Sequence, residues 1–190
     1  MSTVGRPALT TPQAWAAAAL EEIEVAGVHG LSVESVARRA GVSKGGLYHH
    51  YADRRALLRA ALALWETRQV AELGEHFEAI ADPRRRLHEL LIYSGIDVQP
   101  TVIVQFMAAA DDPDVAAVLA RASDARLALL RRIFTQLGAS PAVARHRAIL
   151  AYGHYLGLAQ LRRQDPELLA TPAQMRAHLR QLEGALLEGL

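Results

Sequence analysis

Hydrophobic residues recur with the period of a helix along almost the whole chain. The first such stripe, at i, i+3, i+4 and i+7 of an amphipathic helix, consists of Ala16, Ala19, Leu20 and Ile23. The alternation of β-branched and polar positions that is typical of a half-buried strand is nearly absent. The pattern therefore predicts an all-α protein in which helices pack on helices.

Prolines show where these helices begin. Six of the eight prolines follow Ser, Thr or Asp, whose side-chain oxygens cap helix N-termini, and proline is well tolerated at the first helical position. These pairs begin at Thr11, Asp82, Asp112, Ser140, Asp165 and Thr171. Together with the periodicity they predict about nine helices, near residues 11–27, 33–40, 44–50, 54–80, 83–98, 101–110, 113–137, 141–164 and 172–188.

Residues 32–58 have the spacing of two short helices that cross at a tight turn. Ser32 and Ser43 are N-cap candidates for the two helices, and Ala37 is small enough to let them cross closely. Gly41 can adopt the positive φ that such a turn requires. We therefore predict an N-terminal three-helix domain with a helix-turn-helix over residues 1–55, and a larger helical bundle over residues 56–190.

The second helix of this pair is predicted to expose a distinctive set of residues, Lys44, Gly45, Gly46, Tyr48 and His49. Two glycines near a helix start cost about 1 kcal/mol each relative to alanine, which favours a role that needs close approach to a DNA backbone. Residues 38–55 also hold five cationic side chains and one acidic side chain, although the net charge of the whole chain is only +1. Such a strip is typical of DNA binding; an ordinary solvated face is the alternative where charge stands alone.

These residues resemble the signature of a known family. Residues 33–51, VESVARRAGVSKGGLYHHY, and residues 52–58, ADRRALL, are similar to the helix-turn-helix of the tetracycline-repressor (TetR) family. The resemblance covers about the first third of the chain. Two positions depart from the family pattern, because Ala52 replaces a usual proline and Arg55 replaces an acid.

The resemblance implies an all-α homodimeric regulator whose third helix enters the major groove at each half of a palindromic operator. Lys44 and Gly45 would then lie near the DNA backbone or base edges, and Tyr48 and His49 on phosphates or bases. Arg54 would take the place of the family's usual lysine on a phosphate. The full set of predicted DNA contacts is Arg6, Ser32, Ser43, Lys44, Gly45, Gly46, Tyr48, His49 and Arg54.

The contact predicted for Arg6 rests on the N-terminal arm around Gly5 and Pro7. An arginine there would fit a narrow, A·T-rich minor groove. A tail that carries one arginine and makes no such contact is the alternative.

The last two predicted helices are candidates for a homodimer interface. Gly153 and Gly157 are four residues apart, a spacing that allows close helix approach. The last helix carries a broad apolar face made of Leu179, Leu182, Leu186 and Leu187. We predict a four-helix bundle formed with a second copy, with packing inside one chain as the alternative.

An effector cavity is expected among the fourth to eighth helices, because bundle cores hold ligands. The candidate lining residues are Trp65, Tyr93, Phe106, Met107, Tyr152 and Tyr155. Polar candidates are His88, Asp97, Gln105 and His154. The mostly apolar set favours a small hydrophobic or aromatic effector, although ordinary core packing is the alternative for each aromatic residue.

Patterns of other function classes are missing from the sequence. There is no cysteine and no H-E-x-x-H, phosphate-loop or G-x-S-x-G motif. Asp111, Asp112 and Asp114 fit a helix start at Pro113 better than a metal site. We therefore expect no enzyme, no catalytic or metal site and no cofactor.

No apolar run has membrane-spanning length and no secretory signal is recognisable, so a cytoplasmic location is expected. The predicted function is sequence-specific transcriptional regulation, as a repressor released by a small ligand. The alternative is a helical small-molecule-binding or dimeric interaction protein that does not read DNA.

Overall fold

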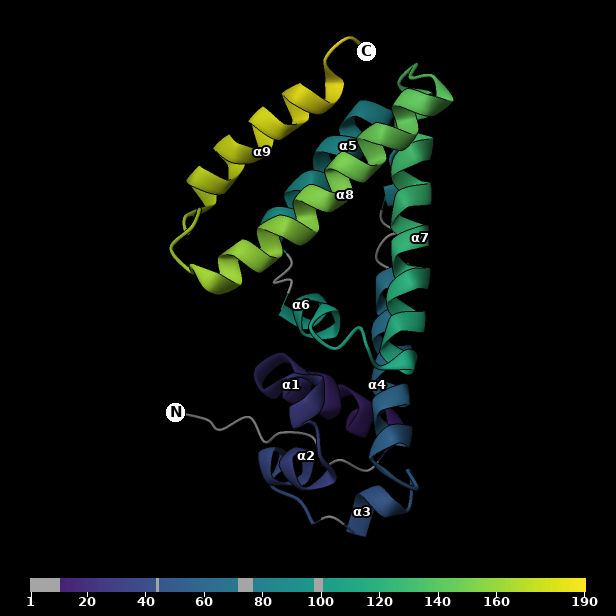
Figure 1. The fold of residues 1–190 in the computed structure, drawn as a ribbon, viewed down its shortest axis with the longest axis vertical. Coiled ribbons are helices and arrows are strands. Elements are labelled where there is room, and N and C mark those ends of the chain that lie inside the picture. The colour runs from purple at the N-terminus through teal and green to yellow at the C-terminus, as the bar shows by residue number, and fades with distance from the viewer. Residues whose placement is uncertain (1–10, 44, 72–76, 98–100) are drawn as a thin grey trace. The chain divides into compact units, whose positions relative to one another are not determined.

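The structure is a computed structural model that describes residues 11–43, 45–71, 77–97 and 101–190. Within these ranges the chain is helical and contains no strand, which confirms the predicted all-α class. The helices, drawn in Figure 1, are α1 (Pro12–Gly30), α2 (Val33–Ala40), α3 (Gly45–Tyr48), α4 (Arg54–Ala71), α5 (Pro83–Ile92), the π-helical turn η2 (Tyr93–Asp97), α6 (Thr101–Met107), α7 (Pro113–Gln136), α8 (Pro141–Gln164) and α9 (Pro172–Leu187). None of the helices in the described ranges is both long and apolar enough to cross a membrane.

The predicted proline-marked helix starts are confirmed at five positions. At α1, for example, Thr11 Oγ1 accepts a hydrogen bond from the backbone N–H of Ala14 at 3.2 Å, as an N-cap should. The same kind of cap is made by Asp82, Asp112, Ser140 and Thr171. The sixth pair begins a turn instead, because Asp165 ends α8 and only a few residues separate it from the cap of α9.

Two predicted helix boundaries differ from the structure in an instructive way. Gly27 has φ +73°, which interrupts the regular geometry of α1 where the predicted helix stops, and one further turn then runs to Gly30. Helix α3 covers only Gly45–Tyr48, which is shorter than the predicted 44–50. Residue 44 lies outside the described ranges, so the start of the predicted helix is not described.

The chain divides into two compact units. The first contains the described residues up to Arg68 together with Gln105–Leu119, and the second contains Gln69–Val104 and Ala120–Leu190. Helices α4, α6 and α7 therefore contribute residues to both units. The predicted functional boundary between residues 55 and 56 stays a prediction, since it concerns which residues act on DNA.

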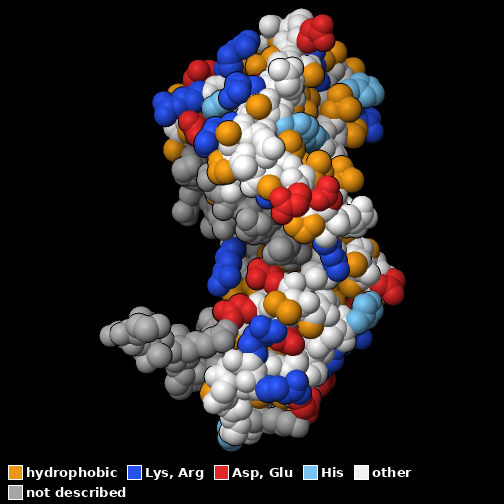
Figure 2. All heavy atoms as spheres, turned by 90° about the vertical axis from the view of Figure 1, so that its left-hand side faces the viewer, with side chains coloured by type: hydrophobic (Ala, Val, Ile, Leu, Met, Phe, Trp, Pro, Cys, Tyr) orange, Lys and Arg blue, Asp and Glu red, His pale blue; other side chains and the backbone are white. Residues whose placement is uncertain are grey.

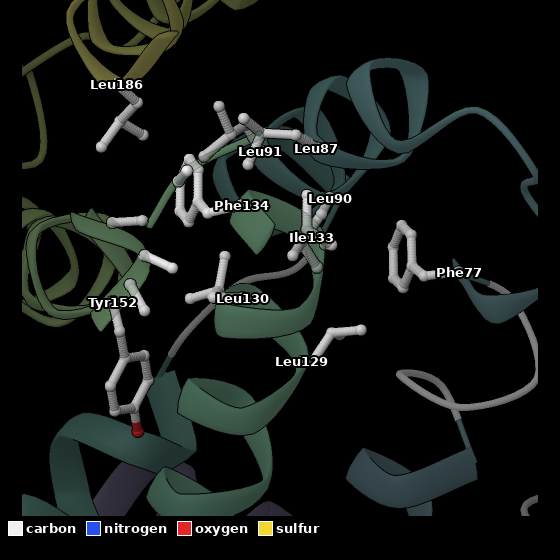
Figure 3. Close-up of a cluster of buried hydrophobic side chains, with 14 residues drawn as sticks. Phe77, Leu87, Leu90, Leu91, Leu129, Leu130, Ile133, Phe134, Tyr152 and Leu186 are labelled. Carbon is white, nitrogen blue, oxygen red and sulfur yellow. The ribbon is translucent and has the colours of Figure 1, made fainter. Parts of the chain in front are cut away.

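The core of the second unit is built from α5, α7, α8 and α9, and α5 and α9 pack on each other (Figure 1). Leu87 and Leu91 of α5 lie beside Phe134 of α7, and Leu186 of α9 belongs to the same cluster (Figure 3). Tyr152 extends from α8 with its hydroxyl directed away from Leu186. This apolar cluster fixes the helices that surround the pocket described below.

Candidate nucleic-acid interface and ligand pocket

Helix α2 is held between an N-terminal cap and a glycine turn. Ser32 Oγ accepts a hydrogen bond from Ser35 N at 2.9 Å, and Ser35 Oγ accepts one from Ser32 N at 3.0 Å, which forms a reciprocal capping box. At the other end Gly41 has φ +69°. This left-handed conformation is unfavourable for any residue that has a side chain. The turn predicted from the sequence is thus confirmed.

A buried core positions α3 relative to α1, α2 and α4. Trp15, Val36, Leu57 and Leu58 are fully buried in the first unit. A Cβ at Gly46 would lie 3.5 Å from the ring of Trp15. One of the two glycines of α3 therefore faces the core at van der Waals distance, a packing role that the sequence analysis did not assign to it.

The described candidate DNA contacts that are exposed lie on α3 or directly beside it. Tyr48 is 56% exposed, an unusually open position for a tyrosine, and Ser43, Gly45 and His49 are also exposed. Gly45 has open space around its Cα, because no atom comes closer than 4.0 Å to an added Cβ. Lys44 and Arg6 lie outside the described residues. The exposed side chain and the bare backbone together form a surface that a DNA groove could contact.

Arg54 has a structural role in this domain. Its Nε donates a hydrogen bond to the Leu31 carbonyl at 2.7 Å, and its Nη2 donates one to the Val28 carbonyl at 2.6 Å. Both acceptors lie at the C-terminal end of α1, where a cation is also favoured by the helix dipole. Arg54 thereby ties the start of α4 to the end of α1, and its predicted phosphate contact stays a prediction.

Replacing Arg54 with methionine is expected to lower the free energy of unfolding by about 2 kcal/mol, because two charge-assisted hydrogen bonds are lost. Denaturant unfolding measures this change. The variant could instead unfold at the same free energy and lose about one phosphate contact in the salt dependence of DNA binding. That result would assign Arg54 to the DNA backbone alone.

The cationic strip predicted from the sequence is partly balanced by acids. Arg39 forms an ion pair with the buried Glu22. Arg55 and Arg59 both donate to Asp114 Oδ2, at 2.7 and 3.0 Å, and these hydrogen bonds lower the pKa of Asp114. Figure 2 shows cationic and acidic side chains alternating over one face of the first unit. Part of the positive charge of this strip is thus used in ion pairs between helices.

The second unit contains a pocket between α5, η2, α7, α8 and α9. Its volume is about 670 Å³, including the space at its open mouth, and its walls are mainly leucine and alanine side chains. The polar residues of the lining are Ser94, Arg126, Tyr152, His154, Tyr155 and Arg162. The guanidinium of Arg126 lies 5.9 Å from the ring centroid of Tyr152 and 5.1 Å from that of Tyr155.

Known proteins resemble this chain most clearly over the helix-turn-helix. Residues 16–61 match the family model described as bacterial regulatory proteins, tetR family. The regulator SrpR of Pseudomonas putida is 29% identical over 113 residues, which cover 50% of this chain and only 51% of SrpR. A crystal structure of a transcriptional regulator from Rhodococcus sp. RHA1 covers 95% of this chain and 97% of its own, with 26% identity and a TM-score of 0.81.

Residues 16–61 thus belong to the DNA-binding domain of the TetR family, and the rest of the chain has the fold of a solved transcriptional regulator. A further solved structure, of AibR with isovaleryl coenzyme A and operator DNA, shares the fold with 22% identity and a TM-score of 0.71, and covers 93% of this chain and 97% of AibR.

Two of the six predicted effector-binding residues, Tyr152 and Tyr155, are among the described residues that line the pocket. Trp65 and Phe106 instead pack edge to face, 5.1 Å apart, in the first unit. The ring of Tyr93 packs against that of Phe77, with 5.4 Å between the ring centroids. Met107 is 38% exposed and belongs to the first unit. Trp65, Phe106 and Tyr93 thus pack against other aromatic rings away from the pocket lining, and ordinary core packing was the alternative considered for them.

Of the predicted polar residues whose side chains are described, one lines the pocket and two contact residues elsewhere. His154 lines the pocket. His88 Nδ1 lies 2.8 Å from Glu183 Oε2, and Gln105 Nε2 donates a hydrogen bond to the Glu24 carbonyl at 3.1 Å. Neither residue is among the described residues that line the pocket. The side chain of Asp97 lies outside the described residues.

Arg126, the basic residue beside the two pocket tyrosines, was missed in the sequence analysis. It occupies an inward position of α7, in register with the buried residues Ala122, Leu129, Leu130 and Ile133. A charged residue inside an apolar stripe of helical period is the signal that could have identified it.

Two histidines meet beside the pocket. His154 Nε2 lies 2.7 Å from His178 Nε2, so one ring donates a hydrogen bond to the other, and the rings stack at 5.0 Å. Burial and, to a lesser extent, the neighbouring charge of His178 lower the pKa of His154 below its ordinary value of 6.5. The folded protein therefore favours a neutral His154.

This lowered pKa predicts a loss of stability in acid. As the pH falls through and below 6.5, His154 takes up a proton in the unfolded chain more readily than in the folded one, so the free energy of unfolding decreases. Denaturation midpoints at about pH 7.5 and about pH 5.5 measure the effect. The pH dependence should be weaker in His154→Gln, and an unchanged profile in that variant would assign it to other groups.

Helix α8 exposes an apolar face to solvent. Leu150 is 62% and Leu161 is 52% exposed, and an added Cβ at Gly153 or Gly157 would meet nothing within 4 Å. These positions recur at helical spacing on one side of α8. Hydrophobic side chains are also visible among charged ones on the face of the second unit in Figure 2.

The apolar face predicted on the last helix is largely covered within the chain. Leu179 and Leu186 of α9 are 3% and 2% exposed, because α5 and η2 pack against this helix. The exposed apolar surface of the last two helices thus lies chiefly on α8.

Proposed function

We propose that this chain is a sequence-specific DNA-binding transcriptional regulator that binds a palindromic operator as a homodimer and is released by a small ligand. The observation that carries the proposal is the open outer side of α3, where Tyr48 is exposed and Gly45 leaves its backbone accessible beside a capped, glycine-terminated α2. The DNA-binding domain of the TetR family and the absence of a catalytic motif in the sequence support a regulator rather than an enzyme. Such a regulator would act in the cytoplasm.

Dimerisation is proposed to occur through α8, with α9 beside it. The exposed positions Leu150, Gly153, Gly157 and Leu161 supply both apolar area and room for a second helix to approach closely. A two-fold dimer would repeat this face in both copies. It would present two recognition helices about 34–36 Å apart, which is one turn of DNA.

Release by ligand is proposed to work through two states of the dimer. A ligand in the second unit would favour a state, reached through a shift of α4, whose recognition helices no longer match the half-site spacing. Linkage then requires that operator DNA weaken ligand binding by the same factor as the ligand weakens operator binding. Equal ligand affinity with and without operator would contradict this mechanism.

Selection of bound sequences from random duplex DNA tests the DNA-binding half of the proposal. The parent protein should enrich a palindrome, and Tyr48→Ala and Lys44→Ala should not. If the parent protein enriches no motif even at low salt, where phosphate contacts are strongest, the alternative of a helical ligand-binding or interaction protein is favoured.

A further inference from the structure

We propose that the pocket of the second unit binds a small monocarboxylic acid with an apolar chain or ring, and that Arg126 holds its carboxylate. This inference rests on the proposed function, because it names the ligand class of the site that would control the regulator. It narrows the expectation from the sequence, which favoured a small hydrophobic or aromatic effector.

The first argument is the environment of Arg126. Nη1 of Arg126 is buried and has no hydrogen-bond partner among the described residues, while Nη2 donates to Gln69. A buried N–H of a charged group that lacks a partner costs considerable free energy. A carboxylate supplies both the missing acceptor and the opposite charge, and the planar guanidinium suits its two oxygens.

The second argument is the balance of charge in the lining. Arg162 also lines the pocket, and its Nη1 reaches the Gly95 carbonyl only at 3.5 Å. Among the described residues that line the pocket there is no Asp or Glu. Two cations and no acid among the described lining residues favour an anionic ligand and disfavour a cationic one.

The third argument is the apolar remainder of the pocket. Leu90, Leu129, Leu158 and Leu179 are among the residues that form its walls, and burial of hydrocarbon against them is favourable. A fully polar anion would leave these walls uncovered, whereas a neutral hydrocarbon would leave Arg126 Nη1 without an acceptor. An acid with an apolar body satisfies both parts of the lining.

Arginine also binds phosphate well, so a coenzyme A thioester is the competing source of an anionic group. We favour the carboxylate because Arg126 lies against Tyr152 and Tyr155, and because its Nη1 is buried. Such a site suits a compact head group better than a large, strongly hydrated diphosphate. The experiment therefore includes both.

Calorimetric titration of the full chain without DNA tests the inference. The probes are octanoate, phenylacetate, their two neutral amides and octanoyl coenzyme A. At least one acid should bind about tenfold or more tightly than its own amide, since a charge-assisted hydrogen bond is lost in the amide. The preference should disappear in Arg126→Gln and decrease in Arg162→Gln.

Arg131→Gln is the matched control, because Arg131 is an exposed arginine of the same helix that does not line the pocket. It should keep the full preference, and thermal unfolding should show that all three variants are folded. The inference is overturned if acid and amide bind equally, if no acid binds, if only the thioester binds, or if Arg126→Gln keeps the preference. Since no DNA is present, failure here is distinct from failure to select an operator.

Discussion

Replacing Leu150 and Leu161 together with arginine is expected to convert a dimer into a monomer. Both leucines are more than half exposed on α8 in the single chain, and in a two-fold dimer each substitution occurs twice. At about 1–2 kcal/mol for each lost leucine contact, four copies weaken association by about a thousandfold or more. The added positive charges would also repel each other across the interface.

Sedimentation equilibrium measures this change directly. Val25→Arg is the matched control, because Val25 is 69% exposed but lies on α1 in the first unit, and it should leave the dimer intact. The doubly substituted protein should also lose tight operator binding, since a monomer contacts only one half-site. A dimer that persists unchanged would assign the interface to another surface.

Replacing Tyr48 with alanine is expected to weaken operator binding about 100-fold. Tyr48 lies on α3 and more than half of it is exposed, so its loss should leave the fold intact. A contact worth about 1.4 kcal/mol at each half-site is lost twice in a dimer, which gives a factor of about ten squared.

Fluorescence anisotropy with the selected palindrome measures this effect at a fixed salt concentration. Tyr48→Phe separates the hydroxyl from the ring, because only a hydrogen bond through the hydroxyl is lost in that variant. His29→Ala is a suitable control, since His29 is exposed on α1 and outside the predicted contact set. If Tyr48→Ala binds as tightly as the parent protein, α3 does not read the DNA through this residue.

The helix-turn-helix could be predicted from the sequence because its determinants are local. Ser32 acts on the backbone three residues away, and Gly41 is needed for the φ of its own position. Such rules depend on the residue and its immediate neighbours, not on the rest of the fold. The same holds for the proline-marked helix starts at Thr11 and Thr171.

The pocket could not be predicted in the same way, because it depends on which inward side chains meet. Trp65 and Tyr152 are both aromatic residues on amphipathic helices, yet one packs against Phe106 and the other lines a cavity. Likewise, the hydrogen bond from Arg54 to the Leu31 carbonyl joins segments that are distant in sequence, so the motif around Arg54 did not indicate this structural role. Contacts between distant segments decided both outcomes.

The most direct test of the account is to compare binding to the selected palindrome with binding to a duplex in which one half-site is scrambled, over a range of salt concentrations. We expect two chains per intact duplex, a loss of most of the affinity when one half-site is scrambled, and an affinity that falls steeply as salt rises. Equal affinity for both duplexes would contradict a dimeric regulator that reads DNA through α3.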